Sequence, residues 1–155
     1  ESSFIIYLLC PHFQNFNKWV VKTPKLYFYD TGLACSLLGI QKHSQLTTHP
    51  LKGNLFENFV VSEMIKNRFN RNESNNLYFW RDNSGNEIDI VIDKGTHLYP
   101  VEIKAGKTIT PDYFKGINFW NKLTGKEGGS VIYTGNELQK RSGAIDILPW
   151  NKFDL

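Results

Sequence analysis

Two neighbouring segments of the sequence, residues 86–93 (NEIDIVID) and 99–104 (YPVEIK), carry acidic and basic side chains at alternating positions. Side chains two residues apart on a strand point to the same face, so Glu102 and Lys104 share a face about 7 Å apart. Asp89 has the matching parity on the preceding strand and can lie beside Glu102 if the two strands pair antiparallel. Two carboxylates and one amine are the minimum set for metal-assisted cleavage of a phosphodiester.

This chemistry requires a cation that neutralises the phosphate and a deprotonated water in line with the leaving oxygen. Mg²⁺, or Mn²⁺ in its place, prefers oxygen ligands and keeps several waters, so one or two protein carboxylates suffice. Asp89 and Glu102 are the candidate metal ligands, and the main-chain carbonyl of Ile103 is a candidate third oxygen. Lys104 would reach the attacking water or the phosphate. Glu57, which shares a helical face with apolar residues, is a candidate outer ligand through water or a ligand for a second metal.

A second interpretation of the same residues stays open. Alternating charges are common on a solvated strand face, and Glu102 and Lys104 would then form an ordinary surface pair of little energetic value. Glu57 would be a helix surface residue or the partner of a nearby lysine, and Glu87 and Asp93 are predicted to be solvated. The four histidines lack ligand spacing, so a zinc site is not indicated. The sequence also lacks the GxxxxGK[ST] pattern of a nucleotide-binding P-loop.

The elements that must position these residues follow from hydrophobic periodicity. Residues 53–70 place apolar side chains at helical spacing, which predicts one long amphipathic helix carrying Glu57. From residue 77 the period becomes alternating, which indicates strands. The predicted elements are a strand at 26–29, a short helix capped by Asp30, a linker at 41–50, the helix 53–70, strands at 77–81, 87–93 and 99–104, a helix opened by Thr110 and Pro111, and strands at 130–135 and 144–150. This order predicts an α/β domain with a mixed central sheet.

Length and composition limit the class of protein. The 155 residues correspond to about one domain. A hydrophobic content of 41% suffices for a core, and 21% charged residues argue against disorder. The net charge of +3 permits an anionic partner without requiring one. Cys10 and Cys35 are too few for a disulfide framework, and no apolar run is long enough to span a bilayer. These features predict a cytoplasmic protein without membrane association.

Four blocks of the sequence carry a resemblance to a known family: VKTPKLYFYDTGLACSLLGI, GNLFENFVVSEM, YFWRDNSGNEIDIVID and YPVEIKAGK. In this order they resemble the C-terminal domain of a large prokaryotic family of AAA+-type ATPases. There, a P-loop ATPase module and a winged-helix segment precede a domain that looks like a PD-(D/E)xK nuclease. The resemblance covers about residues 18–125. It implies a restriction-endonuclease-like α/β fold over residues 18–155, with a mixed central sheet flanked by helices, and a winged-helix tail over residues 1–17. ATP would bind only in the preceding ATPase module.

The nuclease signature of that fold maps onto this sequence position by position. The helix glutamate falls on Glu57, the acidic residue of the second strand on Asp89, and the E-x-K pair on Glu102 and Lys104. Ile88 stands where the usual signature has a proline, a departure that many members of the wider fold share.

The resemblance also implies contacts to nucleic acid. Arg81, in the Trp-Arg-Asp block, is the expected phosphate contact. Tyr113 is the counterpart of a Gln or Tyr that some nucleases carry on the helix after the E-x-K strand. Lys107, at the end of the last block, is the third expected nucleic-acid contact.

We therefore expect Mg²⁺-dependent cleavage or binding of DNA, in partnership with the chain's own ATPase module, and leave a homo-oligomer open. A non-catalytic DNA-binding or assembly module with a vestigial acidic site is the alternative, and the modest net charge favours it because strong DNA binders carry a basic stripe. A protein-recognition domain is a third alternative, which an exposed apolar patch would favour.

Overall fold

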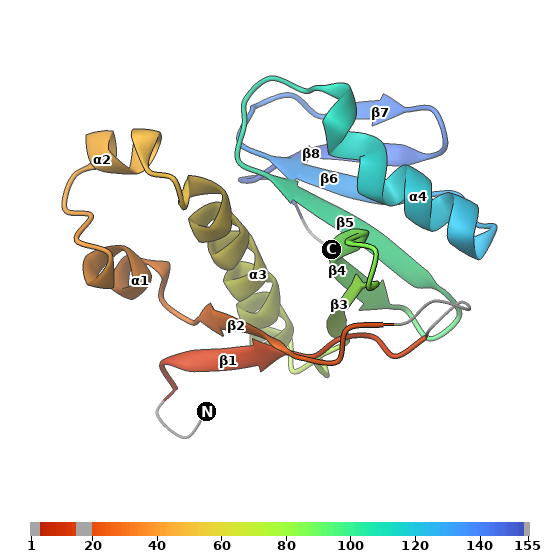
Figure 1. Ribbon diagram of the computed structural model, residues 1–155, viewed down its shortest axis with the longest axis horizontal. Coiled ribbons are helices and arrows are strands. Elements are labelled where there is room, and N and C mark those ends of the chain that lie inside the picture. The colour runs from red at the N-terminus through yellow and green to blue at the C-terminus, as the bar shows by residue number, and fades with distance from the viewer. Residues whose placement is uncertain (1–3, 15–19, 154–155) are drawn as a thin grey trace.

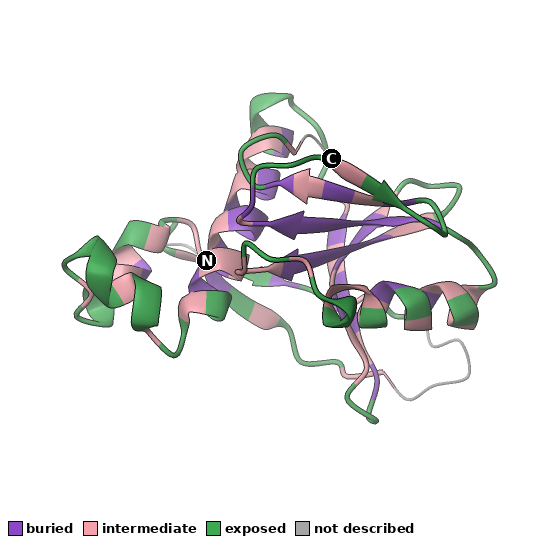
Figure 2. Cartoon of the chain, turned by 90° about the horizontal axis from the view of Figure 1, so that it is seen from above, coloured by how far each residue is buried: buried purple, intermediate pink, exposed green. Residues whose placement is uncertain are grey.

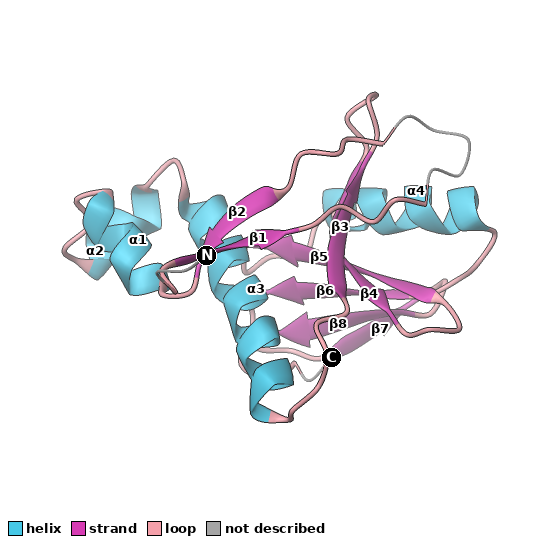
Figure 3. Ribbon diagram, turned by 90° about the horizontal axis from the view of Figure 1, so that it is seen from below, coloured by secondary structure: helices cyan, strands magenta, loops and turns pink. Residues whose placement is uncertain are grey.

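The computed structural model describes residues 4–14 and 20–153, and its centre is a mixed sheet of six strands (Figures 1 and 3). The spatial order of the strands is β3-β4-β5-β6-β8-β7. The first three form an antiparallel meander, β5, β6 and β8 run parallel, and β7 pairs antiparallel at the edge. The strands are β3 (Leu77–Arg81), β4 (Glu87–Asp93), β5 (Leu98–Lys104), β6 (Gly129–Tyr133), β7 (Gln139–Arg141) and β8 (Ile145–Pro149). The predicted α/β class with a mixed sheet is confirmed.

Helices α3 (Lys52–Asn70) and α4 (Lys115–Thr124) cover opposite faces of this sheet. Neighbouring residues such as Ile90 and Val91 belong to different core clusters, as strand alternation requires. Ile88 joins the cluster of Val91 instead of that of Ile90, because the β3–β4 register shifts between Tyr78 and Trp80. One cluster joins α3 to the sheet through Val60, Val61, Met64, Ile65, Ile90, Ile92, Val101, Ile103 and Ile132. Two others join α4 to the opposite face through Trp80, Ile88, Val91 and Trp120, and through Ile117, Val131 and Ile145. The buried strands between exposed helix faces are visible in Figure 2.

A separate two-stranded ribbon consists of β1 (Ile6–Leu9) and β2 (Lys25–Phe28), paired antiparallel. The buried side chain of Asn58 fixes β2 to α3: its Oδ1 accepts from the Phe28 amide at 2.7 Å, and its Nδ2 donates to the Phe28 carbonyl at 3.0 Å. The same Nδ2 donates to Thr31 Oγ1 at 2.8 Å. Helices α1 (Thr31–Leu37) and α2 (His43–Thr48) follow the ribbon and extend away from the large sheet (Figure 1).

The predicted long helix is confirmed, but its buried surface is wider than one apolar stripe. Asn58, Ser62 and Arg68 are buried on α3, while Phe69, predicted to belong to the stripe, is 55% exposed. The cause is that α3 packs against both the large sheet and β2. A second partner on the ribbon side buries polar residues that the periodicity of apolar residues does not register.

Several boundaries differ from the sequence prediction. The segment predicted as a linker at 41–50 contains α2, which buries no side chain and so leaves no periodic signal. The Gln45 side chain accepts the amides of Gln41 and Lys42 at 2.8 Å each and so starts this helix. The helix predicted to open at Thr110 begins as a 3₁₀ turn, Pro111–Phe114, in which Thr110 makes no side-chain cap, and α4 follows. Strands β1 and β7 were not predicted.

The strands that lead into and carry the candidate site agree with the prediction, and so does the cap of α1. Strands were predicted at 77–81, 87–93 and 99–104, where β3, β4 and β5 lie. Asp30 caps α1, since its carboxylate accepts the Gly32 amide at 2.7 Å. Within the residues that the structure describes, none of the helices has the length and apolar character needed to cross a bilayer.

Candidate functional site

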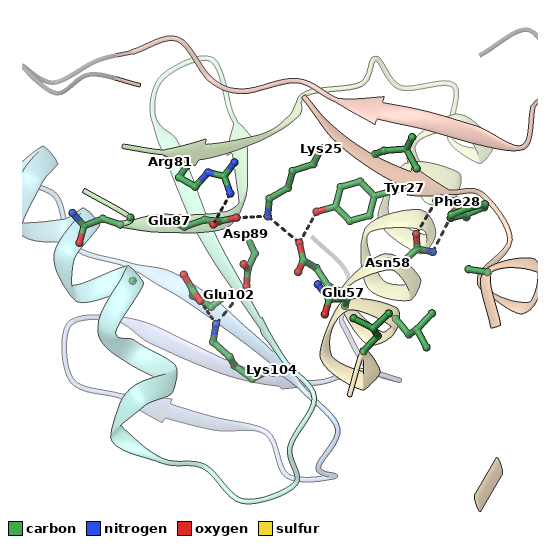
Figure 4. Close-up of a pocket in the computed structure, with 18 of the residues that line it drawn as sticks. Lys25, Tyr27, Phe28, Glu57, Asn58, Arg81, Glu87, Asp89, Glu102 and Lys104 are labelled. Carbon is green, nitrogen blue, oxygen red and sulfur yellow. Dashed lines mark hydrogen bonds and ion pairs between the residues drawn. The ribbon is translucent and has the colours of Figure 1, made fainter. Parts of the chain in front are cut away.

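A cleft of about 930 Å³ opens where β2, α1, α3, β4, β5 and α4 meet (Figure 4). Of the four predicted catalytic side chains, three enter this cleft from the sheet and one enters it from α3. Asp89 comes from β4, Glu102 and Lys104 from β5, and Glu57 from α3. The structure therefore gathers these four side chains in one cleft, although they do not form one cluster.

Asp89 and Glu102 meet because of the register of the β4–β5 hairpin. The last paired residues are Ile90 and Val101, so Asp89 would oppose Glu102 one step further along. The pairing of the two strands ends at Ile90 and Val101. Beyond that pair, the Asp89 carboxylate accepts the Ile103 amide at 2.8 Å. The amine of Lys104 lies 3.5 Å from Asp89 Oδ2 and contacts Glu102 Oε2 (Figure 4). The predicted convergence of the two carboxylates is confirmed.

Glu102 is the most deeply buried of these charged groups, with 5% of its side chain exposed. It lies against the first turn of α4, where Gly116 has no side chain: a Cβ at Gly116 would overlap Glu102 Oε1 and stand 3.0 Å from the Glu87 carbonyl oxygen. Burial, reinforced by the adjacent Asp89 carboxylate and opposed by Lys104, raises the pKa of Glu102 to about 8. Near neutral pH the carboxyl pair therefore holds a proton.

The pKa of the Lys104 amine is also raised, but burial acts on it in the opposite direction. Burial lowers its pKa, but the carboxylates of Asp89 and Glu102 outweigh burial and raise the pKa overall. Lys104 is therefore a cation across the physiological range. Its side chain is 30% exposed, so it can turn out of the carboxylate pair towards the open cleft.

The main chain of Ile103 adds a third group at this place. In a strand, the amide and carbonyl of one residue point to the same side, so the Ile103 carbonyl faces the same gap beside β4 as its amide. Two carboxylates and one carbonyl are an all-oxygen set, which suits Mg²⁺ because that ion retains several waters. Among the described residues, no three or more His, Cys, Asp or Glu side chains are grouped to hold a metal. A cation here would thus depend on Asp89, Glu102 and Ile103.

Glu57 belongs to a second cluster in the same cleft. Its Oε1 accepts from Lys25 Nζ at 3.0 Å and from the Tyr27 hydroxyl. Lys25 also contacts Glu87 Oε1, so one amine bridges a carboxylate of α3 and a carboxylate of β4. The prediction that Glu87 is solvated is wrong, because its side chain is 28% exposed and pairs with this buried amine.

Lys25, Tyr27 and Glu87 were not predicted as site residues. Burial lowers the pKa of the Lys25 amine, but three carboxylates, of Glu57, Asp89 and Glu87, outweigh burial and raise it overall. The available signal was the alternation of residues 25–28, which places Lys25 and Tyr27 on one side of a short strand. Which partner they meet depends on how β2 packs against α3, and local patterns do not contain that information.

Residues 52–153 match a family described as "Domain of unknown function (DUF4143)". The chain belongs to this family. Residues 1–44 match a second family, "Domain of unknown function (DUF8612)". Domains of the DUF4143 family commonly occur with AAA ATPases. Lys25 and Tyr27 therefore come from the DUF8612 segment, while Asp89, Glu102 and Lys104 come from the DUF4143 segment.

Two curated proteins are similar to part of this chain. Uncharacterized protein Rv2008c of Mycobacterium tuberculosis and Uncharacterized protein Mb2031c of Mycobacterium bovis are each 33% identical to it over 110 residues. The match covers 71% of this chain and 24% of each relative. The aligned part thus spans about a quarter of the length of these relatives. No solved structure matches the chain.

The three predicted nucleic-acid contacts differ in how they lie relative to the cleft. Arg81 lines it and approaches Glu87, with Nη1 3.6 Å from Oε2. Tyr113 is half-buried beside it, with its hydroxyl over Gly106, and burial raises its pKa although the nearby Lys104 charge opposes this. Lys107 is exposed on the loop after β5 and is not among the described residues that line the cleft.

The charges that line the cleft nearly cancel. Its described lining contains the carboxylates Glu57, Glu87, Asp89, Glu102 and Asp112 and the cations Lys25, Arg81, Lys104 and Lys115. Five carboxylates against four cations give a formal charge of −1, which becomes zero while the pair of Asp89 and Glu102 holds its proton. The lining therefore offers a polyanion no net attraction unless a cation binds as well.

Proposed function

We propose that this chain is a nuclease domain of a larger AAA+-type ATPase, which uses Mg²⁺ or Mn²⁺ to cleave phosphodiester bonds in DNA. The observation that supports the proposal is the meeting of Asp89 and Glu102 at the amine of Lys104, beside the main chain of Ile103. The restriction-endonuclease-like class belongs to the same proposal, as do the winged-helix tail at residues 1–17 and the nuclease-like domain at 18–155. Residues 1–3 and 15–19 lie outside the described part of the chain.

Each group would have a distinct role. Asp89, Glu102 and the Ile103 carbonyl would supply oxygen ligands, and the bound cation would neutralise the phosphate and lower the pKa of a water ligand. Glu102 would give up its proton when the cation binds. Lys104 would leave the carboxylate pair and place its amine at the attacking water or at the charged phosphate. Glu57 would keep Lys25 and Tyr27 in place behind these groups.

The formal charge of the cleft gives the metal a second role in this proposal. A lining with one excess carboxylate gives no attraction to DNA by itself, whereas a divalent cation between Asp89 and Glu102 reverses its sign. Both DNA binding at the cleft and the cleavage step should therefore depend on the cation. Arg81, Lys107 and Tyr113 would contact the backbone around the cleft.

The test uses single-stranded, duplex and branched DNA incubated with the chain in Mg²⁺, in Mn²⁺ and in EDTA. Lys104→Ala should reduce cleavage about 10²-fold, the usual scale for the loss of one electrostatic catalytic group. The fold should persist, because Lys104 occupies a polar face and its removal opens no apolar cavity. Lys94→Ala is the matched control, since this exposed lysine lies at the turn of the same hairpin. Equal cleavage by the wild type and Lys104→Ala would refute the assignment.

One observation favours a second candidate function. The carboxylate pair of Asp89 and Glu102 is already neutralised by a proton and by Lys104, and such a pair needs no metal to be stable. A non-catalytic DNA-binding or assembly module of the ATPase would preserve this arrangement. Cation-independent DNA binding by the wild type without cleavage in either metal would favour this module over the nuclease.

A further inference from the structure

Lys25 is held more tightly than a surface lysine. Its amine lies 3.0 Å from Glu57 Oε1 and also contacts Glu87 Oε1, and it lies 5.3 Å from the ring centroid of Phe79. Only 18% of its side chain is exposed. An ammonium in this position is a single positive charge with two carboxylate ligands from different elements, which is the arrangement that a bound metal ion would also have.

The cleft thus contains two lysines, each between two carboxylates. Lys104 bridges Asp89 and Glu102, and Lys25 bridges Glu57 and Glu87. They differ in exposure: the side chain of Lys104 is 30% exposed, whereas that of Lys25 is 18% exposed and its amine lies over the Phe79 ring. Lys104 can therefore make room for a cation, while Lys25 stays where it is.

Two further contacts keep Lys25 in this place. The Tyr27 hydroxyl donates to the same oxygen of Glu57, so β2 supplies two donors to one carboxylate. Asn58, the residue after Glu57, holds the main chain of Phe28 on both its amide and its carbonyl. The strand that carries the amine and the helix that carries its acceptor are thereby locked to each other.

We propose that Lys25 is a resident counter-ion that takes the place of a second divalent cation, so that the cleft binds one ion, between Asp89 and Glu102. The ion between Asp89 and Glu102 rests on the proposed metal-dependent function. The role of Lys25 as a counter-ion does not depend on that function. Without the amine, Glu57 and Glu87 would face each other in a partly buried site with only the Arg81 guanidinium, 3.6 Å from Glu87 Oε2, to offset their two charges. Such a pair either takes up a proton or binds a cation. The DUF8612 segment would thus determine how many ions the DUF4143 segment binds.

The experiment counts Mn²⁺ ions bound per chain at pH 7.5, by the electron paramagnetic resonance signal of free Mn²⁺ during titration. The wild type should bind one ion and Lys25→Met should bind two. Methionine keeps an unbranched apolar side chain of similar length and removes the charged amine. Lys25→Arg retains the charge and should still bind one ion. Adding Glu57→Gln to Lys25→Met should return the count from two to one.

Three results separate this proposal from the proposed function. An equal Mn²⁺ count in the wild type and Lys25→Met overturns the counter-ion role. No ion in the wild type but one in Lys25→Met supports that role and refutes the proposed function. If Lys25→Met does not fold without metal, Mn²⁺ should restore its circular dichroism spectrum but should not restore that of the Glu57→Gln double variant. A lack of any restoration then overturns the proposal.

Discussion

Replacing Glu102 with glutamine should stabilise the fold, and the gain should grow with pH. The carboxyl group is buried under α4 beside a second carboxylate, and these surroundings favour its protonated form. Between its ordinary pKa of 4.5 and its raised pKa of about 8, the folded chain holds a proton at Glu102 that the unfolded chain has released. The free energy of unfolding therefore falls as pH rises through this window. Glutamine has no proton to lose and removes that decline.

The size of the effect follows from the shift. One pKa unit corresponds to about 1.4 kcal/mol, so moving from 4.5 to about 8 corresponds to at most about 5 kcal/mol above pH 8. Rearrangement of Lys104 and entry of water reduce this limit, and we expect Glu102→Gln to gain roughly 2 kcal/mol at pH 9. Well below pH 4.5 the wild type is protonated at Glu102 in both states, so the gain should vanish there.

Urea unfolding followed by circular dichroism at pH 5, 7 and 9 measures this gain directly. Glu63→Gln is the control, since Glu63 is a partly exposed carboxylate that pairs with Lys66 on the surface of α3. Its effect should stay within about 0.5 kcal/mol at every pH. The same Glu102→Gln variant should lose Mn²⁺ binding. A variant that is less stable than the wild type at pH 9, or whose gain is independent of pH, would contradict this account of Glu102.

Two further changes test how the site is held. Gly116→Ala should weaken Mn²⁺ binding at least tenfold, because the new methyl group displaces Glu102, whereas Gly53→Ala on α3 meets no atom within 4 Å and should leave binding unchanged. A binding curve for Gly116→Ala that coincides with the wild type would show that Glu102 adapts freely. Asn58→Ala should lower the free energy of unfolding by roughly 2 to 3 kcal/mol in urea titrations, since it leaves both main-chain groups of Phe28 unpaired. A loss below 0.5 kcal/mol, within the usual range for a surface substitution, would mean that Asn58 does not hold β2.

The hairpin site was predictable because its geometry is local. Asp89 and Glu102 lie on consecutive strands joined by a short turn, and side-chain parity decides which residues can face each other. The apolar alternation of the same strands fixes which face is buried. The proximity of Asp89, Glu102 and Lys104 thus needed only the period of a strand and one antiparallel pairing.

The second cluster was not predictable for the opposite reason. Lys25 meets Glu57 across 32 residues of sequence, through a two-stranded ribbon that is not part of the main sheet. No periodic pattern sets the angle at which such a ribbon packs on α3. The burial of Asn58, Ser62 and Arg68 reveals the wider buried surface of α3, but only once the structure is known.

The alternation of side chains would make any slip within the ribbon of β1 and β2 an all-or-none step. Because side chains alternate along a strand, a slip of β2 by one residue would turn Lys25 and Tyr27 away from Glu57 together. A slip of half a residue would break the hydrogen bonds between β1 and β2, so an intermediate position would not be stable. A force that shifts this ribbon would therefore change the charge of the cleft in a single step, and the two hydrogen bonds between Asn58 and Phe28 would resist that step.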